Sequence, residues 1–221
     1  MTPADDPIVL VTGFGPYPRV RVNPTGSLAA RIGRSRRFSR FGLAVRAHVF
    51  ETSYAAAGRD IGPLLEQLAP VACLHLGLAP RAPKVRVETR AENRTRSLAV
   101  DVRGRLPGRR ALVPQGPSTL RGHALAGPAR AAFARAGIPA RLSRDAGAYL
   151  CNAVYYWSLL AAAGDAPGRP VLFVHLPWPA PRAGERPAGR RRRTSRPPTV
   201  DAMARALEAL ALALGAAGRR V

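Results

Sequence analysis

The chain has 221 residues, of which 47% are hydrophobic, and this length and composition predict one globular domain spanning residues 1–221. No apolar run reaches the roughly 20 residues of a membrane-spanning helix, and residues 1–7 lack the basic and apolar regions of a signal peptide, so we expect a soluble protein of the cytoplasm. The net charge of +22 comes almost wholly from arginine, since Lys84 is the only lysine, and with the abundant alanine, glycine and proline it indicates compositional bias rather than a specific nucleic-acid partner.

Strand and helix patterns alternate along the chain. Short apolar, β-branched runs predict buried strands, and capping residues before apolar-periodic stretches predict helices. The predicted strands are 8–12, 43–49, 71–77, 138–143 and 171–175, and the predicted helices are 23–32, 53–68, 118–136, 150–163 and 200–217. Residues 84–93 are extended or loop, and 104–115 are loop. The alternation predicts an α/β fold with a mostly parallel, twisted sheet flanked by helices on both faces.

One stretch, residues 182–198, combines the run Arg190-Arg191-Arg192-Arg193 with proline and glycine and has no apolar periodicity. This composition predicts a solvated, mobile insertion before the last helix. Two interpretations stay open. The stretch is either a long insertion under compositional bias or an arm that binds polyanions.

Cys151 is the first candidate for chemistry. It is expected in the first turn of an apolar helix, where the helix dipole and free backbone N–H groups favour thiolate and can hold an oxyanion. A buried structural thiol is the alternative. The other cysteine, Cys73, is far away in the sequence, so the two do not suggest a disulfide framework, and a cytoplasmic protein keeps both thiols reduced.

His175 and Glu88 are the candidate partners of this thiol. His175 ends a predicted strand, and ligands of parallel α/β sheets bind beyond the carboxyl ends of strands. Its imidazole suits the transfer of a thiol proton to a leaving amine. Glu88 can accept the second ring N–H and fix the tautomer, although a salt bridge with a nearby arginine is the alternative, and Glu92 is the local competitor.

Cys73 and His75 form a competing pair, because residues two apart on a strand face the same side. Two ligands are too few for a structural zinc site, and a core position is the simpler interpretation of Cys73. His48 and His123 have no distinctive context. The glycine-rich stretches match neither a P-loop nor a dinucleotide fingerprint, so we expect no cofactor and no metal.

Four separated blocks resemble the type I pyroglutamyl peptidases. Residues 11–17, VTGFGPY, followed by 23–25, NPT, resemble the N-terminal block of that family, and residues 77–93 resemble the block that carries its catalytic glutamate. Residues 146–152, AGAYLCN, resemble the nucleophile block, and 173–177, FVHLP, resemble the histidine block. The order of the blocks and the separations between Glu88, Cys151 and His175 also agree with the family.

The resemblance implies a single α/β domain that removes N-terminal pyroglutamyl residues from peptides through an acyl-enzyme intermediate. It implies Cys151 as nucleophile, His175 as base and Glu88 as the residue that orients the histidine. Phe14 and Tyr17 match the aromatic residues that bind the lactam ring in the family, and Asn23 matches a nearby asparagine. The expected partners are peptides with a blocked N-terminus, and family members commonly form homo-oligomers.

The chain also departs from the family pattern. Leu78 stands where the family has glutamine, Thr89 where it has arginine, and Leu98 where a further arginine lies near the catalytic centre, with Arg96 as a displaced substitute. Tyr17 replaces phenylalanine. Two alternatives therefore remain beside an active pyroglutamyl peptidase: a related cysteine amidohydrolase with another small acyl substrate, and a retired scaffold that serves as a basic binding protein.

Overall fold

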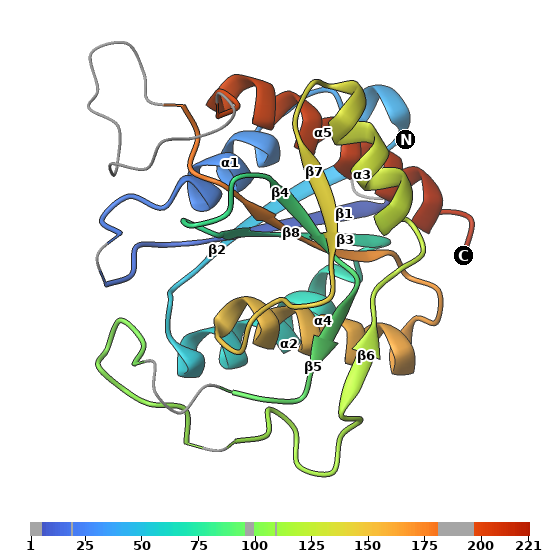
Figure 1. Cartoon of the computed structure of the whole chain (residues 1–221). Coiled ribbons are helices and arrows are strands. Elements are labelled where there is room, and N and C mark those ends of the chain that lie inside the picture. The colour runs from blue at the N-terminus through green and yellow to red at the C-terminus, as the bar shows by residue number, and fades with distance from the viewer. Residues whose placement is uncertain (1–5, 19, 96–99, 109, 181–196) are drawn as a thin grey trace.

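A six-stranded mixed sheet forms the centre of the molecule (Figure 1). The structure, a computed structural model, describes residues 6–18, 20–95, 100–108, 110–180 and 197–221. In spatial order the strands are β2 (Ala44–Phe50), β1 (Ile8–Phe14), β3 (Ala72–Leu78), β8 (Val171–Leu176), β4 (Val85–Glu88) and β7 (Ala140–Ser143). Every neighbouring pair is parallel except β4 and β8, which run antiparallel.

Helices cover both faces of this sheet, and each face has its own hydrophobic core. The helices α1 (Pro24–Gly33), α3 (Ala126–Arg135) and α5 (Val200–Gly218) pack on one face, and α2 (Tyr54–Leu68) and α4 (Leu150–Asp165) pack on the other (Figure 1). A short 3-10 helix, η1 (Ser39–Phe41), precedes β2. The predicted α/β fold, with a mostly parallel sheet between two helical layers, is confirmed.

Local sequence explains where these elements begin and end. The strands β3 and β8 are buried along their whole length, which suits their continuous apolar runs. The side chains of Asn23, Ser53 and Thr199 each accept a hydrogen bond from a backbone N–H in the first turn of the helix that follows, which satisfies a donor left free by helix geometry. The predicted starts of these three helices are therefore confirmed.

The predicted helix 118–136 is wrong over its first part. Thr119–Arg121 is a strand, β6, which pairs antiparallel with β5 (Arg90–Glu92), and α3 begins only at Ala126. The reason is tertiary, because the side chain of Leu120 packs against the core beneath α4 and the N–H of Gly122 donates to the carbonyl of Thr89. Such contacts outweigh local helix propensity. The ambiguous stretch 84–93 accordingly contains two strands, β4 and β5.

None of the helices in the described ranges combines the length and the apolar character that a membrane span requires. The predicted arginine-rich insertion at 182–198 falls almost wholly outside the described residues, so its role stays a prediction. The chain on either side of it comes together, since the N–H of Ala180 donates to the carbonyl of Pro198 at 2.9 Å. Thr199 then caps α5.

Candidate active site

His175 and Glu88 form a buried pair at the junction of β8 and β4. Because these strands run antiparallel, Arg86 is the register partner of His175, and Glu88 follows two residues later on the same face of β4. The Nδ1 atom of His175 lies 2.8 Å from Oε1 of Glu88. Both side chains are almost completely buried, so this hydrogen bond is shielded from water.

Cys151 is the second residue of α4, which packs against β8. It is half-buried, and the charges of Glu88 and Arg86 act on the pKa of its thiol. The helix position agrees with the prediction, but the expectation of a thiolate is wrong for the resting state. Burial, with a contribution from the Glu88 charge, raises the pKa of the Cys151 thiol to about 12, although Arg86 and a backbone hydrogen bond act in the opposite direction.

His175 is uncharged in the same resting state. Burial lowers the pKa of its imidazole, and this effect outweighs the opposing hydrogen bond and charge of Glu88. Arg86 lowers the same pKa further. A neutral imidazole beside a protonated thiol is the state in which a histidine acts as a general base, taking the thiol proton as the sulfur attacks.

Arg86 is a charged neighbour of this pair that sequence reasoning did not select. Its Nε lies 3.3 Å from Oε1 of Glu88, and its Nη2 lies 3.4 Å from Nδ1 of His175. The available signal was the alternation of β4, which puts Arg86 and Glu88 on one face. What could not be read from the sequence is that the strand paired with β4 carries His175 directly opposite Arg86.

The predicted ring-binding residues lie in different settings. Phe14 is buried, and its ring centroid lies 6.5 Å from that of Phe173, whose ring is in turn 4.8 Å from the imidazole of His175. Tyr17 is half-buried. Its pKa is raised by burial and by the charge of Cys151, so its phenol lies within electrostatic range of that sulfur.

The side chain of Asn23 forms hydrogen bonds with nearby residues of the segment that follows β1. Its Oδ1 accepts hydrogen bonds from the N–H and the hydroxyl of Thr25, and its Nδ2 donates to the carbonyl of Gly15 at 3.0 Å. The hydroxyl of Thr52 donates to the same carbonyl. Asn23 therefore shapes the turn that follows Phe14. Leu78 is almost fully buried at the end of β3, where it pairs with Leu176, whereas Arg96 and Leu98 lie outside the described residues.

A tyrosine pair that sequence reasoning missed lies close to Cys151. Tyr149 and Tyr54 contact edge to face, with ring centroids 5.5 Å apart, and their hydroxyls donate to the carbonyls of Val100 and Ala148. Burial raises the pKa of Tyr149, with smaller contributions from charges that include Cys151 and Tyr17. Its place two residues before Cys151 was the signal that could have found it.

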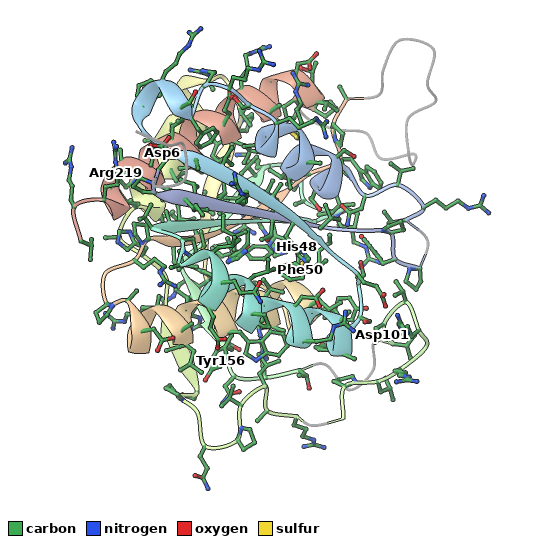
Figure 2. All side chains as sticks on the ribbon, turned by 180° about the vertical axis from the view of Figure 1, so that it is seen from behind. Asp6, His48, Phe50, Asp101, Tyr156 and Arg219 are labelled. Carbon is green, nitrogen blue, oxygen red and sulfur yellow. The ribbon has the colours of Figure 1, made fainter. Side chains whose placement is uncertain are left out.

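The loop that carries Val100 is tied down by a buried carboxylate. Asp101 accepts hydrogen bonds from the backbone N–H groups of Arg103 and Arg105, and from that of Tyr54 at 3.4 Å. Figure 2 shows Asp101 beside one end of the sheet-flanking helix α2. This side of the site is therefore built from segments far apart in the sequence.

The residues that competed with the candidate triad are paired with other groups or lie in the hydrophobic core. Glu92 pairs with Arg90 and Arg94 instead of a histidine. Cys73 is fully buried, and burial raises the pKa of its thiol to about 12. His75 is also fully buried, with Nδ1 2.8 Å from the Thr12 hydroxyl.

Within the described part of the chain, no cluster of three or more His, Cys, Asp or Glu side chains is arranged to hold a metal ion. His48 packs on Phe50, as Figure 2 shows, and lies 3.5 Å from Asp60. His123 accepts a hydrogen bond from the N–H of Leu125. Neither histidine belongs to the group around Cys151.

Comparison with known proteins extends over almost the whole chain. The sequence profile of the family described as pyroglutamyl peptidase matches residues 8–219. The pyrrolidone-carboxylate peptidase of Pseudomonas fluorescens is 31% identical over 209 residues, which cover 93% of this chain and 91% of that protein. The pyrrolidone-carboxylate peptidase of Gloeobacter violaceus is 32% identical over 173 residues, which cover 77% of this chain and 81% of that protein.

Solved structures give the same result. The pyrrolidone carboxyl peptidase from Thermus thermophilus has a TM-score of 0.75 and 33% identity, and the match covers 94% of this chain and 98% of that one. The pyrrolidone carboxyl peptidase from Thermococcus litoralis has a TM-score of 0.83 and 25% identity, with 95% and 93% covered. Sequence and fold agree along nearly the full length, and the chain belongs to the pyroglutamyl peptidase family.

Proposed function

We propose that this chain is a cysteine peptidase that removes N-terminal pyroglutamyl residues from peptides, with Cys151 as nucleophile, His175 as general base and Glu88 as the residue that orients His175. The observation that carries the proposal is the buried contact of 2.8 Å between Nδ1 of His175 and Oε1 of Glu88, together with the Cys151 thiol at the start of α4, on whose pKa the charge of Glu88 acts. The relatives named pyrrolidone-carboxylate peptidase support the substrate class.

The protonation states support a general-base mechanism. Glu88 accepts the Nδ1–H of His175, which leaves the lone pair on Nε2 free to take a proton. As Sγ of Cys151 bonds to the pyroglutamyl carbonyl carbon, its proton moves to Nε2, and the carbonyl oxygen becomes an oxyanion. Backbone N–H groups in the first turn of α4 are the nearby donors that suit this charge.

Three proton transfers complete the cycle. The tetrahedral intermediate collapses as the C–N bond breaks, and His175 gives its proton to the departing amine, which leaves a thioester on Cys151. Water then attacks the thioester carbonyl while His175 takes a proton from it. When this second intermediate collapses, the proton returns to the sulfur, and free pyroglutamate leaves.

The surroundings of the thiol fit a small, uncharged acyl group. Tyr17 and Tyr149, which lie within electrostatic range of Cys151, offer aromatic surface that suits the faces of a lactam ring, and Phe14 belongs to the buried cluster that also contains Phe173. We further propose that residues 1–221 form one peptidase-like domain, since one six-stranded sheet contains both β1 and β8 and helices from both halves of the chain cover it. We place the enzyme in the cytoplasm, where a reducing environment keeps Cys151 free.

Hydrolysis of a pyroglutamyl-arylamide under reducing conditions tests this function. The wild type is expected to release the arylamine, and Cys151→Ser is expected to lose about 10³-fold or more of kcat, because the hydroxyl is a far weaker nucleophile in a site built around a thiol. Cys73→Ala is the matched control and keeps activity, since Cys73 is a core residue. Full turnover by Cys151→Ser would contradict the proposed nucleophile.

Leu78 favours one alternative, a cysteine amidohydrolase with a different small acyl substrate. An almost fully buried leucine at the end of β3 has no side-chain group to bind a lactam N–H or C=O. A cyclopentanecarbonyl-arylamide, which has a ring of similar size without those polar groups, separates the two readings. Preference for the lactam by a factor on the order of 10² or more supports pyroglutamyl specificity, and equal rates support the alternative.

A further inference from the structure

Arg86 occupies a place in the catalytic centre that the proposed triad does not explain. It lies opposite His175 across the antiparallel β4–β8 pair and shares a face of β4 with Glu88. Its guanidinium reaches both partners, with Nε 3.3 Å from Oε1 of Glu88 and Nη2 3.4 Å from Nδ1 of His175. Thus one arginine contacts the same two atoms that form the buried His175–Glu88 hydrogen bond.

The carboxylate needs such a neighbour. The Glu88 side chain has 0% exposure, and within the described residues its Oε2 has no hydrogen-bond partner. Burying a carboxylate is unfavourable unless an opposite charge lies close to it. An arginine is charged at every pH of interest, and with 22% of its side chain exposed Arg86 keeps part of its own hydration. The Nε–H of Arg86 also makes no hydrogen bond among the described residues, so its interaction with Glu88 is an ion pair.

We infer that Arg86 is a positioning residue of this enzyme: its guanidinium balances the buried Glu88 carboxylate and holds it against Nδ1 of His175, so that Nε2 stays free to take the thiol proton. The inference rests on the proposed roles of Cys151, His175 and Glu88. Arg86 acts through Glu88 and His175 rather than by bonding to the substrate.

The charges around His175 set the sign of the expected effect. From β4, the charge of Glu88 raises the pKa of His175 and that of Arg86 lowers it, and Asp145, in the loop before α4, raises it. Arg86 also lowers the pKa of Cys151, which Glu88 raises. Removing the guanidinium therefore raises the pKa of both groups. His175 then stays protonated to a higher pH, and less Cys151 is thiolate at any given pH.

The test compares Arg86→Met, Arg86→Lys and a matched control, Arg141→Met. Arg141 is the register partner of Arg86 on the other neighbouring strand, β7, and is exposed. Arg86→Met is expected to lower kcat by about tenfold to a hundredfold with little change in KM, because the imidazole is less well held. The acidic limb of its kcat/KM profile moves to higher pH. Arg86→Lys restores part of kcat and returns the limb toward the wild type, and Arg141→Met changes neither.

A second measurement separates this inference from the substrate assignment. Alkylation of Cys151 by iodoacetamide, followed from pH 6 to 10 in a Cys73→Ala background, needs no substrate. Arg86→Met is expected to react more slowly than the parent at each pH, whereas Arg141→Met matches the parent. If the wild type cleaves no pyroglutamyl-arylamide, the proposed function fails while the alkylation profiles still decide the role of Arg86.

Parental kcat and an unshifted alkylation profile in Arg86→Met overturn the inference. Equal losses of kcat in Arg86→Met and Arg141→Met overturn it as well, because the effect then follows total charge. Thermal unfolding of each variant shows whether it is folded. If Arg86→Met does not fold, Arg86→Lys carries the test. It preserves the charge, so a partial loss of kcat with an acidic limb close to that of the wild type is expected, and an acidic limb displaced to higher pH despite the preserved charge contradicts the electrostatic role.

Discussion

Gly77 and His175 are register partners on the parallel strands β3 and β8, and the imidazole occupies space that a side chain at position 77 would need. A Cβ at Gly77 would lie 2.9 Å from Cδ2 of His175 and 2.7 Å from Cε1 of Phe173. Both rings are held by buried neighbours, so neither has an easy way to move. The site therefore requires glycine here for reasons of space, because the backbone of Gly77 is that of an ordinary strand.

Gly77→Ala is expected to move the imidazole away from its position against Glu88. Displacement of a catalytic group by about 1 Å costs on the order of 10²-fold in rate, so kcat should fall by that order. The overpacked site should also lower the free energy of unfolding by about 1–3 kcal/mol. Steady-state kinetics and urea unfolding measure the two effects.

Gly164→Ala is the matched control for this substitution. Gly164 lies in α4, and apart from the helix's own backbone no described residue lies within 4 Å of the position of its added Cβ. Alanine in a helix is more favourable than glycine by roughly 0.5–1 kcal/mol, so this variant should be slightly more stable and fully active. Full activity of Gly77→Ala would contradict the steric account of His175.

Glu88→Gln tests the orientation of the histidine. The amide keeps the shape of the side chain but offers an N–H that can face Nδ1, and this favours the wrong imidazole tautomer. We expect kcat to fall by about 10²- to 10⁴-fold with KM little changed. Glu92→Gln is the control, since Glu92 pairs with Arg90 and Arg94. A larger loss of kcat in Glu92→Gln than in Glu88→Gln would show that Glu88 is not the residue that orients His175.

Tyr155 and Tyr156 offer a matched pair of hydroxyl deletions. The hydroxyl of Tyr155 donates to the backbone carbonyl of Glu88 at 3.1 Å, and that of Tyr156 donates to the carbonyl of Pro117 at 2.8 Å. Each Tyr→Phe change should lower the free energy of unfolding by about 1 kcal/mol. Only Tyr155→Phe should lower kcat, by a few-fold, because only Tyr155 supports the residue that holds His175. Equal effects on kcat would show that the contact to Glu88 is purely structural.

Acid should destabilise the fold through His75. Burial lowers the pKa of His75 from 6.5 to about 3, so between those values the unfolded chain binds a proton that the folded chain does not. The stability present above pH 6.5 is therefore lost as the pH falls through this window, at about 1.4 kcal/mol per pH unit for one such group.

His75→Leu isolates this contribution, because the other titrating groups are common to both proteins. Urea unfolding at pH 7, 6 and 5 should show the variant losing less stability than the wild type on acidification. The hydrogen bond between His75 and Thr12 is lost at every pH, so it shifts the two curves by a constant. Parallel curves would mean that His75 takes up its proton without unfolding.

The sequence alone determined the architecture and the chemical inventory. The apolar runs of β1, β3 and β8 and the capping side chains of Asn23, Ser53 and Thr199 are local signals, since burial on both faces and free helix N–H groups each demand particular residues in place. The motif blocks around Glu88, Cys151 and His175 likewise single out these three as the candidate reactive groups, because the signal lies in the residue types and their spacing.

Only the tertiary structure decided which of these groups meet and in what state. The antiparallel direction of β4 puts Arg86 opposite His175, and pairing of β5 with β6 displaces the first part of a predicted helix. Burial by distant segments raises the pKa of Cys151, although its helix position alone favours thiolate. Strand direction, pairing and desolvation depend on neighbours far away in the chain, whereas a local pattern reports only on the residues that compose it.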